Sequence, residues 1–334
     1  MRKTHALALA IGFIAAGTAS AKENIDFMFP APVDGKLTME MTRVIKEFNQ
    51  SQNDVEVRGI FTGSYDTTKV KAEAAAKSGQ PPALVIMSAN FTADLAIKNE
   101  ILPMDELFKF GDQKATPFLT QNFWPAMRQN AQLNGVTYAI PFHNSTPILY
   151  YNKDMFAKAG ITAPPKDWDE LLEDSKKLTD SAKGQWGIML PSTNDDYGGW
   201  ILSALTRANG GQYYNADYPG EVYYDKPSTL GALRFWQNLV YRDKVMPSGV
   251  LNSKQISAAF FSGKLGMAML STGALGFMRE NTKDFELGVA MMPAKVRNGV
   301  TIGGASLVSF KGISDDQKKA AYTFLQYLVS PKVN

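Results

Sequence analysis

Cysteine and histidine, two residue types often used in catalysis and metal binding, are scarce in this chain of 334 residues. Cysteine is absent, and histidine occurs twice, as His5 and His143. The lack of cysteine excludes thiol nucleophiles, disulfides, iron–sulfur clusters and cysteine zinc sites. A Ser-His-Asp triad would have to use one of the two histidines. The sequence therefore offers little material for a hydrolase or a metalloenzyme.

The first 21 residues have the pattern of a secretory signal peptide. A basic pair at positions 2–3 precedes an apolar run from Ala6 to Ala16, and Ala19-Ser20-Ala21 follows as a small-residue cleavage motif. The run is shorter than the ~20 residues that a membrane-spanning helix needs. Cleavage would remove His5 and leave 33 basic and 32 acidic residues, a net charge of +1. Near-neutrality argues against nucleic acid or an anionic membrane as a partner, and one histidine excludes sites with two histidine ligands.

Adjacent tyrosines and adjacent carboxylates suggest two other functions. Tyrosines are adjacent at Tyr150-Tyr151, Tyr213-Tyr214 and Tyr223-Tyr224, and phenolates suit a hard ferric ion. Neighbours in a strand face opposite sides, so a pair in β structure cannot hold one ion with both rings. The adjacent carboxylates Asp169-Glu170 and Asp195-Asp196 are the candidates for an exported carbohydrate-active enzyme, whose two carboxyl groups must lie about 5–9.5 Å apart. Adjacency in sequence supplies no such separation, so both functions stay alternatives.

The elements that must position any site form two α/β series. Apolar runs predict strands over 25–29, 55–61, 84–87, 138–142, 148–151, 186–190, 265–270 and 287–292. Helical spacing predicts helices over 37–48, 69–77, 91–98, 168–178, 200–209, 230–241, one ending at 261, and a last one opened by a capping box at Ser314 and Gln317. Short alternation of strands and helices is typical of a parallel sheet covered by helices. Because the pattern restarts near residue 140, we expect two lobes, 22–144 with 290–334 and 145–289, with chain crossings near 140–147 and 290–300.

Several motifs resemble one family from the first residue to the last. They resemble the family 1 extracellular solute-binding proteins that serve ABC importers of sugars. Asn144-Ser145-Thr146-Pro147 and Gly303-Gly304-Ala305-Ser306 point to the branch that binds sn-glycerol-3-phosphate. The matching segments are 63–65, 141–154, 165–171, 271–275, 288–293 and 302–307. The resemblance implies an α/β fold of the two-lobed periplasmic-binding-protein class, type II. Each lobe would have a mixed sheet flanked by helices, and a ligand cleft would lie between them.

The same resemblance implies a function. The chain would be a monomeric periplasmic receptor that captures sn-glycerol-3-phosphate or glycerophosphodiesters and delivers them to the membrane permease subunits of an ABC importer. It would have no catalytic residues, cofactor or metal. A neutral sugar or disaccharide is the alternative ligand within the class. The family continues past Asn334 with a pocket tyrosine and an arginine, so we expect a fragment or truncated form whose binding is weak or absent.

Carried over residue by residue, the resemblance implies ligand contacts at Tyr65, Ser145, Ser271 and Gly304. It also places Ser88 where the family has a glutamate, so a carboxylate that could accept from ligand hydroxyls becomes a smaller neutral group. We expect the Tyr65 ring to lie on the C–H face of a polyol while its hydroxyl donates to it.

Four further expectations concern these contacts and their surroundings. Ser271 and Gly304 are expected to open loops directly after apolar strands, where ligands of α/β sheets bind. Backbone N–H groups at Gly303-Gly304 could then approach an anion, helped by the helix turns that follow. We add Trp200 to the candidates because Tyr197-Gly198-Gly199 before it suggests an exposed aromatic loop. His143 is expected to make a structural hydrogen bond at the hinge.

Overall fold

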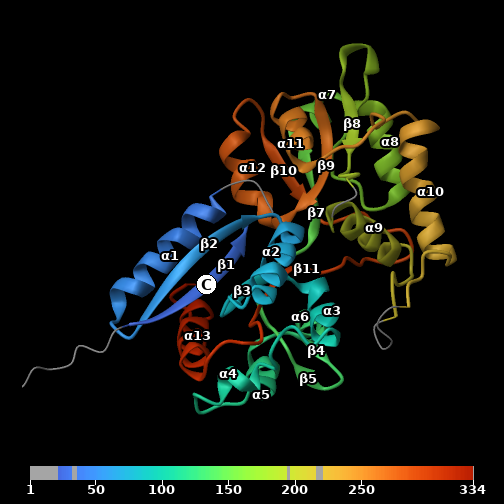
Figure 1. Ribbon diagram of the computed structural model, residues 1–334. Helices are drawn as coiled ribbons and strands as arrows, with labels where there is room; N and C mark the ends of the chain where they lie inside the picture. The colour runs from blue at the N-terminus through green and yellow to red at the C-terminus, as the bar shows by residue number, and fades with distance from the viewer. Residues whose placement is uncertain (1–21, 32–35, 194–195, 216–220, 334) are drawn as a thin grey trace, which may run out of the picture.

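Two α/β halves, each built on its own sheet, make up the computed structural model, which describes residues 22–31, 36–193, 196–215 and 221–333 (Figure 1). The predicted signal peptide, Asp195 and residue 334 lie outside these ranges. Across the part of the chain that is described, the helices are all too short or too polar to traverse a bilayer.

The first half contains a five-stranded mixed sheet in the order β2-β1-β3-β11-β6. Strand β1 pairs in parallel with β2 and β3, whereas β11 runs antiparallel to both β3 and β6. Alternate residues of β1, Ile25, Phe27 and Phe29, enter one core cluster, while Met28 enters the cluster on the other face, as the two-residue period of a strand requires. The strands are β1 Glu23–Pro30, β2 Val55–Gly63, β3 Leu84–Ser88, β6 Ile140–Ser145 and β11 Gly303–Val308.

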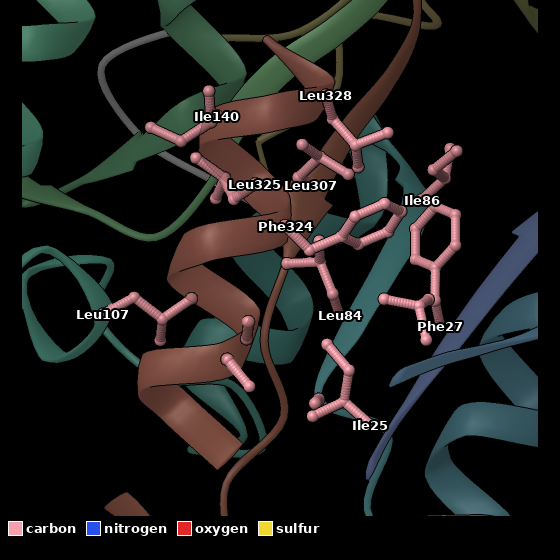
Figure 2. Packing of buried hydrophobic residues seen from close by; sticks show 14 of the residues in the cluster. Ile25, Phe27, Leu84, Ile86, Leu107, Ile140, Leu307, Phe324, Leu325 and Leu328 are labelled. Carbon is pink, nitrogen blue, oxygen red and sulfur yellow. The ribbon is translucent and has the colours of Figure 1, made fainter. Parts of the chain in front are cut away.

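Helices cover both faces of this first sheet. Helix α1 (Leu37–Ser51) buries Met41, Val44, Ile45 and Phe48, which share one helical face. The last helix, α13 (Asp315–Leu328), packs beside it over β1, β3, β11 and β6, as Figure 2 shows. Helix α2 (Tyr65–Lys77) lies against the opposite face. The remaining elements are α3 Thr92–Ile97, α4 Asp105–Phe108, α5 Ala115–Asn122, α6 Pro125–Arg128, β4 Gln132–Leu133 and β5 Val136–Thr137, with 3₁₀ turns at Ala89–Phe91 and Gln129–Ala131.

The second half contains a four-stranded mixed sheet in the order β10-β7-β9-β8. Strand β7 is antiparallel to β9 and β10, and β8 is parallel to β9. Two core clusters form on its two faces, one with α8, α9 and α10 and one with α11 and α12. The elements are β7 Pro147–Asn152, α7 Lys153–Lys158, α8 Trp168–Leu178, β8 Trp186–Met189, α9 Asp196–Ala208, α10 Pro227–Tyr241, α11 Ser253–Phe261, β9 Leu265–Ser271, α12 Leu275–Asn281 and β10 Leu287–Ala290, with 3₁₀ turns at Ser181–Lys183 and Thr272–Ala274.

The chain passes between the sheets at two places that meet each other. The first crossing is short, because β6 ends at Ser145 and β7 begins at Pro147. The second runs from the end of β10 to Gly303, and its residues 294–301 hydrogen-bond to the second half, for example from Val296 N–H to the Ala208 carbonyl at 2.8 Å. Gly303 then pairs with Ser145 in the first sheet. The two crossings are therefore held side by side where the sheets meet.

The structure confirms much of the predicted element order and corrects it in several places. Helix α8 has the predicted bounds, and the capping box at Ser314 and Gln317 is formed. Gly304 does not open a loop after a strand, and no helix turn follows it, because Gly303 and Gly304 are the first residues of β11. The short helices and strands of 99–137 and the helices α7 and α12 were not predicted. Tyr197-Gly198-Gly199 was expected to form an exposed loop before Trp200, but all four residues lie within α9. The lobe boundaries stay a prediction, although Ala290 pairs within the second sheet.

Candidate functional site

The predicted ligand contacts gather where the two sheets meet. Strand register places Ser145 opposite Gly303, Asn144 opposite Gly304, and Pro147 opposite Ser271. Strands of both sheets thus begin or end within a few residues of one another. We call this region the junction; it comprises Ser88, His143, Ser145, Ser271, Gly303 and Gly304 with the side chains of Tyr65, Tyr197 and Trp200 that contact them.

Ser271 ends β9, and its N–H, its carbonyl and its Oγ all form hydrogen bonds. Its backbone N–H donates to Tyr197 Oη at 2.6 Å, and its carbonyl accepts from Tyr150 Oη at 2.8 Å. Its own Oγ accepts from Gly273 N–H at 3.0 Å and so caps the 3₁₀ turn that follows. A hydroxyl that accepts one hydrogen bond still has its proton to donate. Ser271 therefore combines a fixed position with a remaining donor.

Gly303 and Gly304 fit the junction because they lack a side chain. Gly304 has φ +121°, a conformation that other residues rarely adopt, and a β-carbon there would lie 2.1 Å from the His143 carbonyl oxygen. A β-carbon at Gly303 would lie 2.6 Å from Trp200 Nε1. The glycine pair thus brings β11 against β6 on one side and against the indole of the second half on the other.

Trp200 carries a buried donor at this contact. Its ring meets that of Tyr197 edge-on, with centroids 5.6 Å apart and planes at 88°. Its Nε1 is buried and finds no hydrogen-bond partner within the described ranges. Burying an N–H without an acceptor costs about 1–3 kcal/mol, so a solute oxygen that reached this group would remove the penalty. The indole N–H is therefore an unsatisfied donor at the contact between the two halves.

Ser88 and Tyr65 complete the junction from the first half. Ser88 ends β3, is buried, and lies opposite Ala305 of β11; its Oγ donates to Asn90 Oδ1. Tyr65 is the first residue of α2, and its Oη lies 3.0 Å from His143 Nε2. His143 also faces Ala305 in the register. The strand β11 therefore connects both positions to the glycine pair.

The electrostatics of the junction are those of neutral donors and acceptors. Burial lowers the pKa of His143 to about 4, so its imidazole is uncharged near neutral pH. The other junction residues contribute hydroxyls, an indole and backbone amides. Such groups can hold a small polar solute by directed hydrogen bonds, and the N–H and O–H donors among them can solvate an anion.

The structure thus brings all six sequence-predicted contacts to one region. Register unites Ser145, Ser271 and Gly304; Trp200 joins them through Gly303, and Ser88 and Tyr65 join through β11 and His143. The supporting roles of Tyr150 and Tyr197 were not predicted. The only local signal for Tyr197 was the Tyr-Gly-Gly sequence before Trp200, and the Tyr150 contact has no local signal because it reaches across 121 residues.

Two of the three tyrosine pairs contact each other, but the tyrosines are poorly suited to bind a ferric ion. Tyr150 is fully buried and its hydroxyl is bonded to Ser271, so burial raises its pKa. Tyr213 packs edge-on against Tyr224 with centroids 5.2 Å apart, and burial raises the pKa of Tyr213 to about 12. Both shifts disfavour the phenolate that a ferric ion needs. Within the described ranges, no group of three or more histidine, aspartate or glutamate side chains could hold a metal ion.

The described carboxylate pair, Asp169-Glu170, makes separate surface contacts. Asp169 forms an exposed ion pair with Lys295, and Glu170 accepts from the Lys166 backbone N–H. Asp195 and the side chain of Asp196 lie outside what the structure describes. The groups of the Asp169-Glu170 pair are therefore engaged at the surface of the second half.

The model of the family described as "Bacterial extracellular solute-binding protein" matches residues 43–334. The chain belongs to this family. It is 29% identical to the sn-glycerol-3-phosphate-binding periplasmic protein UgpB of Yersinia enterocolitica, a match that covers 100% of this chain and 76% of the relative. It is 28% identical to UgpB of Salmonella typhimurium, covering 98% of this chain and 75% of the relative.

Solved structures give the same architecture. UgpB from Mycobacterium tuberculosis in complex with glycerophosphocholine superposes with a TM-score of 0.79 at 24% identity, covering 93% of this chain and 78% of that one. A solute-binding protein of Thermotoga lettingae bound with α-D-tagatose gives 0.80 at 24%, with the same coverage. The predicted type II two-lobed fold and the predicted family are confirmed. The chain is a solute-binding protein of an ABC importer, with a small molecule and a permease as its partners, and such proteins are not enzymes in general.

Proposed function

We propose that this solute-binding protein captures sn-glycerol-3-phosphate, or a glycerophosphodiester that contains it, in the periplasm. It would act as a monomer after removal of residues 1–21 and deliver its ligand to the permease. The names of the relatives at 27–29% identity support this ligand. The residues 1–21 support the location because they combine charged, apolar and small residues in the order of a signal peptide.

The observation that carries the proposal is the set of donors at the junction. Ser145 and Ser271 come together with the Gly303-Gly304 backbone, and the buried Trp200 Nε1 lacks an acceptor. A phosphate presents only acceptors, so it suits such a set. These features favour an anionic polyol.

A neutral sugar is the second candidate, and Ser88 is the observation that favours it. A small neutral group widens the range of hydroxyl patterns that the site could accept. The fold does not distinguish a phosphorylated polyol from a neutral sugar, because similar structures hold α-D-tagatose, maltose and D-mannitol.

Isothermal titration calorimetry on the full chain tests the two candidates. sn-Glycerol-3-phosphate, glycerophosphocholine and maltose would each be titrated up to millimolar concentration, so that weak binding is also measured. We expect saturable heat with the two phosphates and none with maltose. Heat from maltose alone would overturn the proposal in favour of the sugar.

A substitution connects the measured binding to the junction. Trp200→Phe removes the indole N–H but keeps an aromatic ring, so we expect about threefold to tenfold weaker binding, the worth of one hydrogen bond. Trp124→Phe is the matched control, because Trp124 is 76% exposed on the first half. Equal affinity of both variants and the wild type would place the ligand elsewhere.

A further inference from the structure

His143 lies on β6 beside the junction with its backbone fixed by neighbouring strands. Ala305 of β11 faces it in the register, and β11 approaches so closely at Gly304 that no β-carbon fits beside the His143 carbonyl. Its Nε2 lies 3.0 Å from Tyr65 Oη. The two rings are tilted by 40° with centroids 6.4 Å apart, so they meet through their polar atoms and not by stacking. The contact is therefore a directed hydrogen bond.

This hydrogen bond joins two elements that the strand order separates. Helix α2, which begins with Tyr65, packs against β1, β2 and β3, whereas β6 is the edge strand on the other side of β11. Tyr65 and His143 are 78 residues apart in the chain. A phenol on the first turn of a helix has alternative rotamers, and the bond to an anchored imidazole selects one of them. The bond to His143 thereby helps to fix where the Tyr65 oxygen lies.

The chemistry of the pair gives the bond a direction. A neutral imidazole has one N–H and one bare nitrogen. Burial keeps this imidazole neutral down to about pH 4, because its pKa falls to that value, and burial is the only cause of the shift. Phenol is the stronger acid of the two groups and imidazole the stronger base. The favoured arrangement therefore has Tyr65 donating to a bare Nε2, with the imidazole proton on Nδ1.

We propose that His143 is a positioning residue for solute binding: it accepts the Tyr65 hydroxyl proton and so presents the phenol oxygen to a hydroxyl group of the solute as an acceptor. This assignment replaces the expectation that the Tyr65 hydroxyl donates to the ligand. It rests on the proposed function for the kind of solute, a polyol that also carries a phosphate. Tyr65 then recognises the hydroxyl end, and the donors at Ser271 and Trp200 are left for the phosphate.

Nitrogen NMR tests the hydrogen bond without any ligand. The full chain labelled with ¹⁵N-histidine contains two imidazoles, and His143→Gln identifies the signals of His143 by their loss. We expect a protonated Nδ1 and a bare Nε2 whose shift changes in Tyr65→Phe. A protonated Nε2 at neutral pH would overturn the proposal, since Tyr65 would then be the acceptor.

Calorimetry with two ligands tests the role in binding. His143→Phe removes the acceptor and should weaken sn-glycerol-3-phosphate binding about threefold to tenfold. Propyl phosphate, which has no hydroxyl, should bind the variant as well as it binds the wild type. His143→Gln keeps an acceptor at the place of Nε2 and should restore most of the loss. Equal losses for both ligands would reduce His143 to a structural residue and contradict the proposal.

A double-mutant cycle separates positioning from general destabilisation. If His143 acts through Tyr65, then Tyr65→Phe combined with His143→Phe should bind no more weakly than Tyr65→Phe alone. Fully additive losses would contradict this. Thermal melting of each variant shows that it is folded. A wild-type chain that binds maltose and neither phosphate would contradict the proposed function, and the NMR measurement would still decide the hydrogen bond.

Discussion

Three neighbouring strands of the first sheet have two unlike ends. One end of β3, β11 and β6 carries Leu84, Leu307 and Ile140 into the apolar cluster beneath α13 (Figure 2). The other end of the same strands carries Ser88, the Gly303-Gly304 pair and Ser145 to the junction. Buried apolar area and close packing stabilise the cluster. Directed hydrogen bonds stabilise the junction, where the two glycines also allow a close approach of the backbones. A single set of strands thus anchors the site to the core.

The comparison predicts different responses at the two ends, and the largest belongs to the cluster. Phe324 of α13 is fully buried between Phe27 and Phe48, with ring centroids 5.1 and 4.8 Å away. Phe324→Ala should lower the free energy of unfolding by about 3–5 kcal/mol, because it leaves a cavity. Urea denaturation checks this value. Met39→Ala, at a position 69% exposed on α1, is the control and should change little.

At the junction we expect a smaller loss of stability that is coupled to binding. Gly304→Ala combines a positive φ with a backbone clash, whereas Gly135→Ala has a positive φ and open space. The difference between the two variants isolates the clash and should be about 1–3 kcal/mol of unfolding free energy. Solute affinity should fall only in Gly304→Ala. Equal effects of the two substitutions would show that β11 and β6 separate easily, and that the junction is not tightly held.

The ionisable group at the junction adds a dependence on pH that the apolar cluster lacks. His143 takes up a proton near pH 6.5 in the unfolded chain but only near pH 4 in the folded protein. Between these values the unfolded state binds the extra proton, so the free energy of unfolding falls as the pH falls through this window. Over the whole window the loss should amount to about 3 kcal/mol.

Denaturation of the wild type and of His143→Gln at pH 7 and pH 4.5 measures this contribution. Carboxylates elsewhere titrate in both proteins, so the histidine contribution is the difference between their pH dependences. Parallel curves for the two proteins would mean that the imidazole is charged and solvated in the fold.

The two ends also differ in how well the sequence predicts them. Helix α8 was predicted with its bounds because its apolar residues repeat at helical spacing over eleven residues. Helices α4, α5 and α6 were missed because four to eight residues show too little of that period. The cluster residues are likewise visible as apolar strands and helix faces.

The junction residues have no comparable local pattern. Ser145, Ser271 and Gly304 were proposed through a family resemblance, and their convergence follows from strand pairing between distant segments. Gly304 was expected in a loop, since nothing local shows that a glycine at φ +121° starts a strand. The bond between Tyr65 and His143 depends on the whole strand order. Periodicity therefore predicts the end of these strands that enters the apolar cluster, whereas the end at the junction depends on pairing between distant segments.

The smallest expected effect concerns an ion pair between the two halves. Lys36, directly before α1, lies 2.9 Å from Glu280 of α12, and both side chains are more than half exposed. Exposed pairs contribute little and are screened by salt. Lys36→Glu should therefore leave the midpoint of denaturation almost unchanged. Because the pair spans the two halves, the substitution should still weaken solute binding slightly at low salt and not at high salt.

The reversed pair, Lys36→Glu with Glu280→Lys, restores the attraction and should restore the low-salt affinity. Calorimetry at two salt concentrations makes the comparison, with Lys295→Glu as a control, because its ion pair with Asp169 lies within the second half and its adjoining crossing segment. If Lys295→Glu and Lys36→Glu change binding equally, net charge and not contact between the halves would explain both. A specific effect of Lys36 would show that even a weak contact changes solute affinity when it connects the two halves.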